Sequence, residues 1–94
     1  MELRKIEKIS KALGDISRLK IIQHMQCNRN RIECMELAGI LNLAQPSISH
    51  HIKKLTEAEL IEPRKEGRFH NYVLNTKLLK EYTSSLQKLG TVQT

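Results

Sequence analysis

The sequence predicts a mainly helical domain that carries one small β-hairpin. Apolar residues recur every three or four positions in five stretches, as on the buried stripe of an amphipathic helix. Residues 60–74 instead form two extended segments around a turn that contains Gly67. The chain has 94 residues, which is enough for one domain with a modest core. We expect a single domain over residues 1–90 and a short tail over residues 91–94.

Two helices are predicted at the start of the chain. The first covers residues 2–13 and ends at Gly14, and Asp15 is a good N-cap for the second. The first stripe consists of Leu3, Ile6, Ile9 and Leu13, and the second of Ile16, Leu19, Ile22 and Met25. The second helix ends in a polar, basic connector at residues 27–31.

Residues 33–60 predict a helix–turn–helix. The first helix covers residues 33–41, and its apolar stripe consists of Cys34, Leu37, Ala38 and Leu41. Asn42 suits the turn because it tolerates the left-handed backbone that ends helices. Pro46 suits the first turn of the next helix, where its missing N–H costs nothing. That helix is expected to bury Ile48, Ile52 and Leu55.

The opposite face of this second helix is cationic and rich in hydroxyl groups. It holds His50, Lys53 and Lys54, with Ser47 and Ser49 beside them. An apolar back and a basic, hydrogen-bonding front suit a helix that lies in the major groove of DNA. A solvated amphipathic helix pair is the ordinary alternative, and the helix–turn–helix spacing favours DNA binding over it.

The hairpin at residues 60–74 is expected to form a basic wing. Gly67 supplies the positive φ that a tight turn requires, and Pro63 confines its strand to an edge of the sheet. Arg64, Lys65 and Arg68 crowd the tip. The hairpin directly follows the second helix of the helix–turn–helix, which is the expected recognition helix. We therefore expect the hairpin to touch phosphates or the neighbouring minor groove. The alternative is a charged turn that faces only solvent.

A last helix is predicted over residues 75–89, with Asn75 as its N-cap and Gly90 at its end. Leu79, Tyr82, Leu86 and Leu89 alternate spacings of three and four, as in a coiled-coil seam. Such a seam packs either on the body of the domain or on a partner subunit, and we favour the partner.

Composition bounds the function. The net charge of +6 indicates an anionic partner, most simply nucleic acid. The chain shows no signal peptide and no apolar run of 18 residues, so we expect a cytoplasmic protein with no membrane association. It has no nucleophile–base constellation and no phosphate-cradling glycine loop, so we expect no enzymatic activity. Two functions stay open: a regulator that binds double-stranded DNA, and a module whose main partner is a protein or RNA.

Three motifs resemble the ArsR/SmtB family of winged-helix repressors. Residues 13–22 (LGDISRLKII) resemble the family's L-x-D-x-x-R-L-x-I-L opening, and residues 45–55 (QPSISHHIKKL) resemble its S-Q-S-x-V-S-H-H-L-x-x-L recognition helix. Residues 66–74 resemble the x-G-R-x-x-x-Y-x-L wing. The pattern keeps Gln45, Ser47, Ser49 and His50 as leading DNA contacts, whereas Ala44 and Pro46 replace two serines.

The resemblance implies a winged helix-turn-helix that acts as a homodimer, joined through its first and last helices. Leu3 and Ile6 would then join Leu79, Tyr82, Leu86 and Leu89 in the dimer interface. The dimer would bind an inverted repeat in an operator and repress transcription until an inducer, which the sequence does not identify, releases it.

The sequence leaves several interpretations of Cys27 and Cys34 open. One type of metal site in the family uses a Cys-x-Cys pair where this chain has Glu33-Cys34-Met35, with a single thiolate. Another type uses Asp and His pairs across the final helix, where this chain has only Glu81. A soft metal ion or metalloid would need a third ligand such as His24 beside both cysteines. Alternatively the two thiols form a redox switch across the connector, or Cys34 is simply a core residue. No cofactor is therefore assigned.

Overall fold

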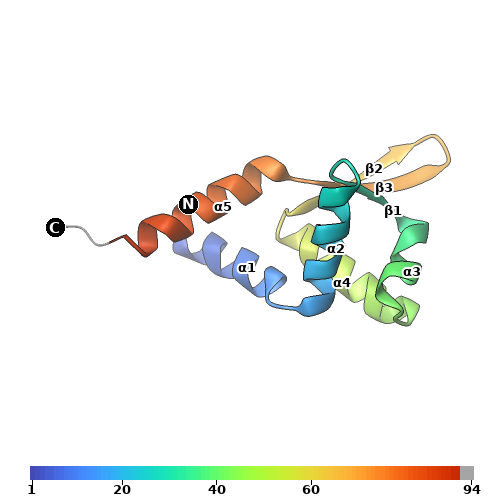
Figure 1. Cartoon of the computed structure of the whole chain (residues 1–94), viewed down its shortest axis with the longest axis horizontal. Coiled ribbons are helices and arrows are strands. Elements are labelled where there is room, and N and C mark those ends of the chain that lie inside the picture. The colour runs from blue at the N-terminus through green and yellow to red at the C-terminus, as the bar shows by residue number, and fades with distance from the viewer. Residues whose placement is uncertain (92–94) are drawn as a thin grey trace.

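The computed structural model describes residues 1–91, and only the backbone of Phe69, so residues 92–94 of the expected tail lie outside the described part. It confirms the mainly helical fold with a small β-hairpin (Figure 1). The elements run in the order α1 (Leu3–Leu13), α2 (Ile16–Cys27), β1 (Arg31–Glu33), the 3-10 helix η1 (Cys34–Glu36), α3 (Leu37–Leu41), α4 (Gln45–Glu57), β2 (Ile61–Glu66), β3 (Phe69–Leu74) and α5 (Thr76–Leu89). Among the described residues, no helix is long and apolar enough to cross a membrane.

The predicted starts of the helices are confirmed by their caps. Asp15 Oδ1 accepts hydrogen bonds from the backbone N–H groups of Ser17 at 2.8 Å and Arg18 at 3.3 Å. Asn75 Oδ1 accepts from the N–H of Leu78 at 3.1 Å. These bonds satisfy N–H groups that have no partner inside the helix. Asn42 has a φ of 51°, so the turn between α3 and α4 is left-handed as expected.

The stripe predicted for α2 was partly wrong. Ile16 and Leu19 are 67% and 44% exposed, whereas Ile21 and Met25 are fully buried. The helix carries apolar residues on more than one side, so spacing alone did not select the buried side. Packing against α1, α3, α4 and β1 made that choice.

The helix predicted over residues 33–41 was also partly wrong. Its start is the 3-10 helix η1, closed by a capping box between Glu33 and Glu36, and only residues 37–41 are α-helical. Residues 31–33 just before it form a third strand, which pairs with β3 and buries Ile32. This pairing joins residues about forty positions apart, so the spacing of apolar residues along residues 31–33 could not predict the strand. Cys34 and Ala38 are exposed as a result.

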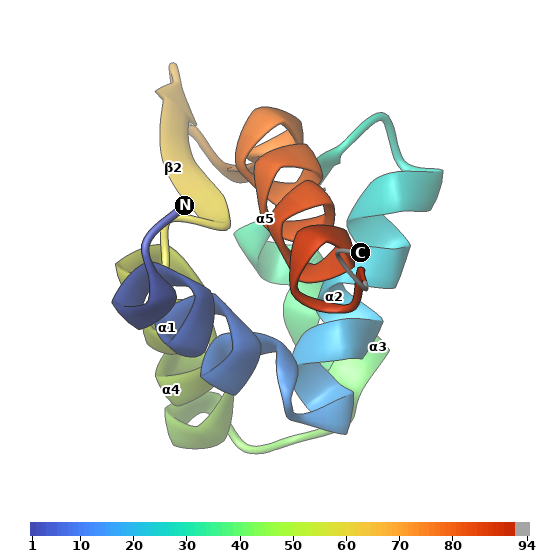
Figure 2. The same ribbon diagram turned by 90° about the vertical axis from the view of Figure 1, so that its left-hand side faces the viewer.

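The three strands form an antiparallel sheet in the order β1-β3-β2. Pro63 therefore lies on an edge strand, opposite Tyr72, as predicted. Gly67 has a φ of 62° in the turn between β2 and β3. Seen end-on, α1, α4 and β2 line one side of the molecule, whereas α2, α3 and α5 lie toward the other side (Figure 2).

Candidate nucleic-acid interface

Helix α4 presents a continuous polar face to solvent. Its apolar side is buried through Ile48, Ile52 and Leu55, which are at most 8% exposed. All the recognition-helix residues predicted to contact DNA are exposed, namely Gln45, Ser47, Ser49, His50, Lys53 and Lys54. The helix has Ala44 at its N-cap and no side-chain cap. Pro46 has no N–H, and the N–H of Ser47 donates to the Ala44 carbonyl at 3.0 Å, so the polar face of the helix is the part that it offers to DNA.

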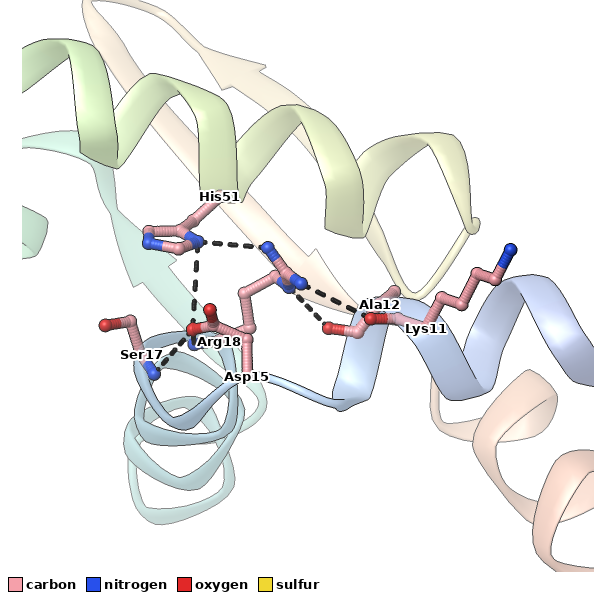
Figure 3. Close-up of polar contacts among 6 residues, drawn as sticks. All are labelled: Lys11, Ala12, Asp15, Ser17, Arg18 and His51. Atoms are coloured by element: carbon pink, nitrogen blue, oxygen red, sulfur yellow. Dashed lines mark hydrogen bonds and ion pairs between the residues drawn. The ribbon is translucent and has the colours of Figure 1, made fainter.

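A polar cluster fixes α4 to the junction of α1 and α2 (Figure 3). His51 Nδ1 lies 3.1 Å from Nη1 of Arg18 and 3.9 Å from Oδ1 of Asp15. The same guanidinium donates to the carbonyl oxygens of Ala12 and Lys11. One arginine therefore ties the recognition helix to the end of the first helix. The sequence analysis assigned no role to Arg18, whose signal was the D-x-x-R spacing of residues 15–18.

The electrostatics of this junction favour an ionised Asp15. Partial burial by itself would raise the pKa of Asp15. The backbone N–H groups of Arg18 and Ser17 and the charges of Arg18 and His51 outweigh burial and lower the pKa below its ordinary value. The carboxylate is thus held in the charged form that caps α2.

The hairpin carries the predicted basic residues at its tip, and all three are exposed. Arg64 lies 3.4 Å from the Glu62 carboxylate, so its charge is partly neutralised. Within residues 1–91, neither Lys65 nor Arg68 is found in an ion pair. These two residues are therefore the wing cations best placed for a phosphate.

The residues predicted for the dimer interface separate into two groups. Leu3, Leu86 and Leu89 are 70%, 40% and 61% exposed, so they offer apolar surface to a partner. Ile6 and Tyr82 are only 8% exposed and belong to the core of the protomer, where the Tyr82 hydroxyl lies 2.8 Å from Ser10 Oγ. Leu79 is partly buried against the same core.

Cys27 and Cys34 are both free and exposed, so the interpretation of Cys34 as a core residue was wrong. The Cys34 thiol neighbours Tyr72 on β3. Burial and the neighbouring thiol together raise the pKa of Tyr72 above its ordinary value. The third ligand considered for a metal site, His24, is paired with a carboxylate: its Nε2 lies 3.1 Å from Oε2 of Glu36. Within the described part of the chain, no three His, Cys, Asp or Glu side chains lie close enough together to hold a metal ion.

Comparison with known proteins agrees with this arrangement. Residues 15–62 match the model of the arsR family of bacterial regulatory proteins. The chain is 33% identical over 91 residues to the arsenical resistance operon repressor of Staphylococcus aureus, which covers 97% of this chain and 86% of that one. It is 34% identical over 73 residues to the transcriptional repressor SdpR of Bacillus subtilis, covering 78% and 79% of the two chains.

Solved structures show the same fold. HlyU from Vibrio cholerae superposes with a TM-score of 0.70 at 28% identity, over 95% of this chain and 97% of that one. An ArsR-like regulator from Rhodococcus gives a TM-score of 0.81 at 24% identity, over 93% and 80% of the chains. The matched family consists of regulatory proteins, and the two relatives from Staphylococcus aureus and Bacillus subtilis are transcriptional repressors rather than enzymes. The polar face of α4, the basic wing and these matches together show that the chain belongs to the arsR family of bacterial regulatory proteins.

Proposed function

We propose that this protein is a cytoplasmic repressor that binds an operator inverted repeat as a homodimer and leaves it when a signal arrives. The exposed row on α4, from Gln45 to Lys54, is the observation that carries the proposal. Gln45 can form two hydrogen bonds with an adenine, and the serines can bond a base or a phosphate. Lysines and wing cations supply charge that is independent of sequence.

The homodimer is supported by apolar surface left over after the protomer has folded. Leu3 on α1 and Leu86 and Leu89 on α5 are exposed large hydrophobic residues, and α1 and α5 lie side by side (Figure 1). Covering them with a second copy would remove this surface from water. Two copies would also present two α4 helices to successive turns of the major groove, which are about 34 Å apart.

The test combines footprinting with a measurement of mass. Footprints of the purified protein on random and selected duplexes should show two protected half-sites, with centres about one helical turn apart. Sedimentation should give twice the protomer mass, and Leu86→Glu with Leu89→Glu should give a monomer that binds DNA weakly. Lys77→Glu, an exposed change on the same helix, serves as the control. A wild-type monomer that ignores duplex DNA in dilute buffer would contradict the proposal.

Cys34 is the best-supported input for the signal. It is an exposed thiol at the junction of β1 and η1, and it contacts Tyr72 on the strand that continues into the wing. Modification of this thiol would disturb both the sheet and the start of the helix–turn–helix. DNA release should therefore be measured with oxidants, persulfides, arsenite and metal ions on wild type, Cys34→Ser and Cys27→Ser. Release that survives unchanged in both variants would exclude a cysteine signal.

A further inference from the structure

We propose that a basic cleft between α1 and α4 binds a phosphate of the DNA backbone beside the groove that α4 enters. The inference rests on the proposed function and adds a contact outside the recognition helix and the wing. The cleft has a volume of about 220 Å³. It is lined by Lys8, Lys11, Ala12, Arg18, Lys54 and Glu57.

The cleft has unbalanced positive charge. Lys8, Lys11 and Lys54 are exposed, and none of them is found in an ion pair within residues 1–91. Glu57 is the single carboxylate in the lining, and it already lies 3.9 Å from Lys53 Nζ. Other lysines in this region differ, because Lys5 is paired with Glu59 at 3.7 Å. The unpaired cations thus gather in one hollow.

Arg18 makes one wall of this cleft rigid. Its guanidinium donates to two backbone carbonyls, which carry no charge, and it contacts the His51 ring (Figure 3). Its charge is thus only partly offset, by the Asp15 carboxylate nearby. An arginine already held in place loses little side-chain entropy when an anion arrives. A phosphodiester oxygen fits this combination of one fixed and three mobile cations.

The position of the cleft points to the backbone of the duplex that α4 reads. Helices α1 and α4 lie on the same side of the molecule (Figure 2), and Lys54 belongs to both the cleft and the exposed face of α4. The wing lies beyond the opposite end of the domain from α1 (Figure 1). The cleft would therefore hold the strand on the α1 side of the groove, and the wing would hold the strand on the other side.

The test compares two charge-matched double variants. Lys8→Ala with Lys11→Ala removes the two α1 lysines that line the cleft. Lys20→Ala with Lys77→Ala removes two exposed lysines from α2 and α5, which lie toward the side of the molecule away from the cleft (Figure 2). Each protomer of the dimer would lose one phosphate contact, so the two losses together should reduce the slope of log K against log salt by about 1.8. Raising the salt concentration from 50 to 200 mM should therefore weaken DNA binding by the alanine variant about tenfold less than it weakens binding by wild type. The control pair should keep the wild-type slope.

Two further arms identify the ligand and guard against misfolding. Lys8→Arg with Lys11→Arg should restore the slope, and all variants should unfold at the wild-type urea concentration. Neutral methylphosphonates are then placed one at a time along the operator. Methylphosphonates at the positions that face α1 should weaken DNA binding by wild type and leave binding by the Lys8→Ala, Lys11→Ala variant unchanged.

The outcomes distinguish the two proposals. If wild type binds no duplex, the proposed function fails. If wild type binds and both alanine pairs give the same slope, or no methylphosphonate position loses its effect in the cleft variant, the cleft inference alone is overturned.

Discussion

His51 Nδ1 lies 3.1 Å from Nη1 of Arg18, and this contact joins the recognition helix to the helix before the helix–turn–helix. Since Arg18 also donates to carbonyls at the end of α1, three helices meet at one side chain. Most of α4 is held by apolar packing, which allows some sliding. The directional bonds of Arg18 fix its orientation, and the first prediction follows from this.

Arg18→Ala should lower the free energy of unfolding by about 1–3 kcal/mol, because charge-assisted hydrogen bonds are lost and two carbonyls lose their partner. It should also weaken operator binding more than this loss of stability explains. Urea unfolding and fluorescence anisotropy measure the two effects. Arg18→Lys keeps the charge but cannot reach three acceptors together, so it should recover only part of either quantity. Full recovery would mean that charge alone matters.

The lowered pKa of Asp15 predicts a pH dependence of stability. Because folding lowers this pKa, the ionised carboxylate stabilises the protein above the unfolded pKa of about 3.9, and the contribution disappears as pH falls through the folded value. Asp15→Asn keeps a good N-cap but removes the charge. The variant should therefore be less stable than wild type at pH 7, and the difference should shrink as pH falls below about 3.9 and through the lower folded pKa. A difference that is constant with pH would contradict this assignment.

Gln45→Ala should change sequence preference, whereas Lys53→Ala should change affinity for every sequence. Loss of a paired hydrogen bond to one base should reduce discrimination at that base pair by about 1–3 kcal/mol. Loss of a lysine should weaken all duplexes alike and reduce the salt slope by about 0.9 for each protomer of the dimer. Binding to a panel of operators with single base-pair changes measures both. Equal losses across the panel for Gln45→Ala would show that this residue does not read a base.

Gly67→Ala should destabilise the wing. Among the described residues, apart from the two chain neighbours, no atom lies within 4 Å of the position that a Cβ would take at Gly67, but its φ of 62° is unfavourable for alanine. We expect a cost of about 1 kcal/mol. Gly39 is the matched control, because it is helical, exposed and also open around its Cβ. Gly39→Ala should stabilise the protein by about 0.5–1 kcal/mol. Chemical denaturation of the two variants should therefore shift in opposite directions.

The sequence by itself determined the features that depend on neighbouring residues. Asp15 and Asn75 cap helices because their own side chains reach the next turn, and Asn42 and Gly67 permit left-handed turns. The buried stripe of α4 and its exposed polar face follow from helical spacing alone, as does the place of Pro63 on an edge. These local rules were enough for the fold class and for the recognition helix.

Only the tertiary structure decided which of several equivalent surfaces is buried. It buried Ile21 together with the predicted Met25 and left Ile16 and Leu19 exposed. It also paired residues 31–33 with β3 and left Cys34 exposed. It also brought Arg18 to His51, 33 positions away, and gathered the lysines of α1 and α4 around one cleft. Such contacts arise when distant elements pack, because each one depends on the position of a partner that local spacing does not encode.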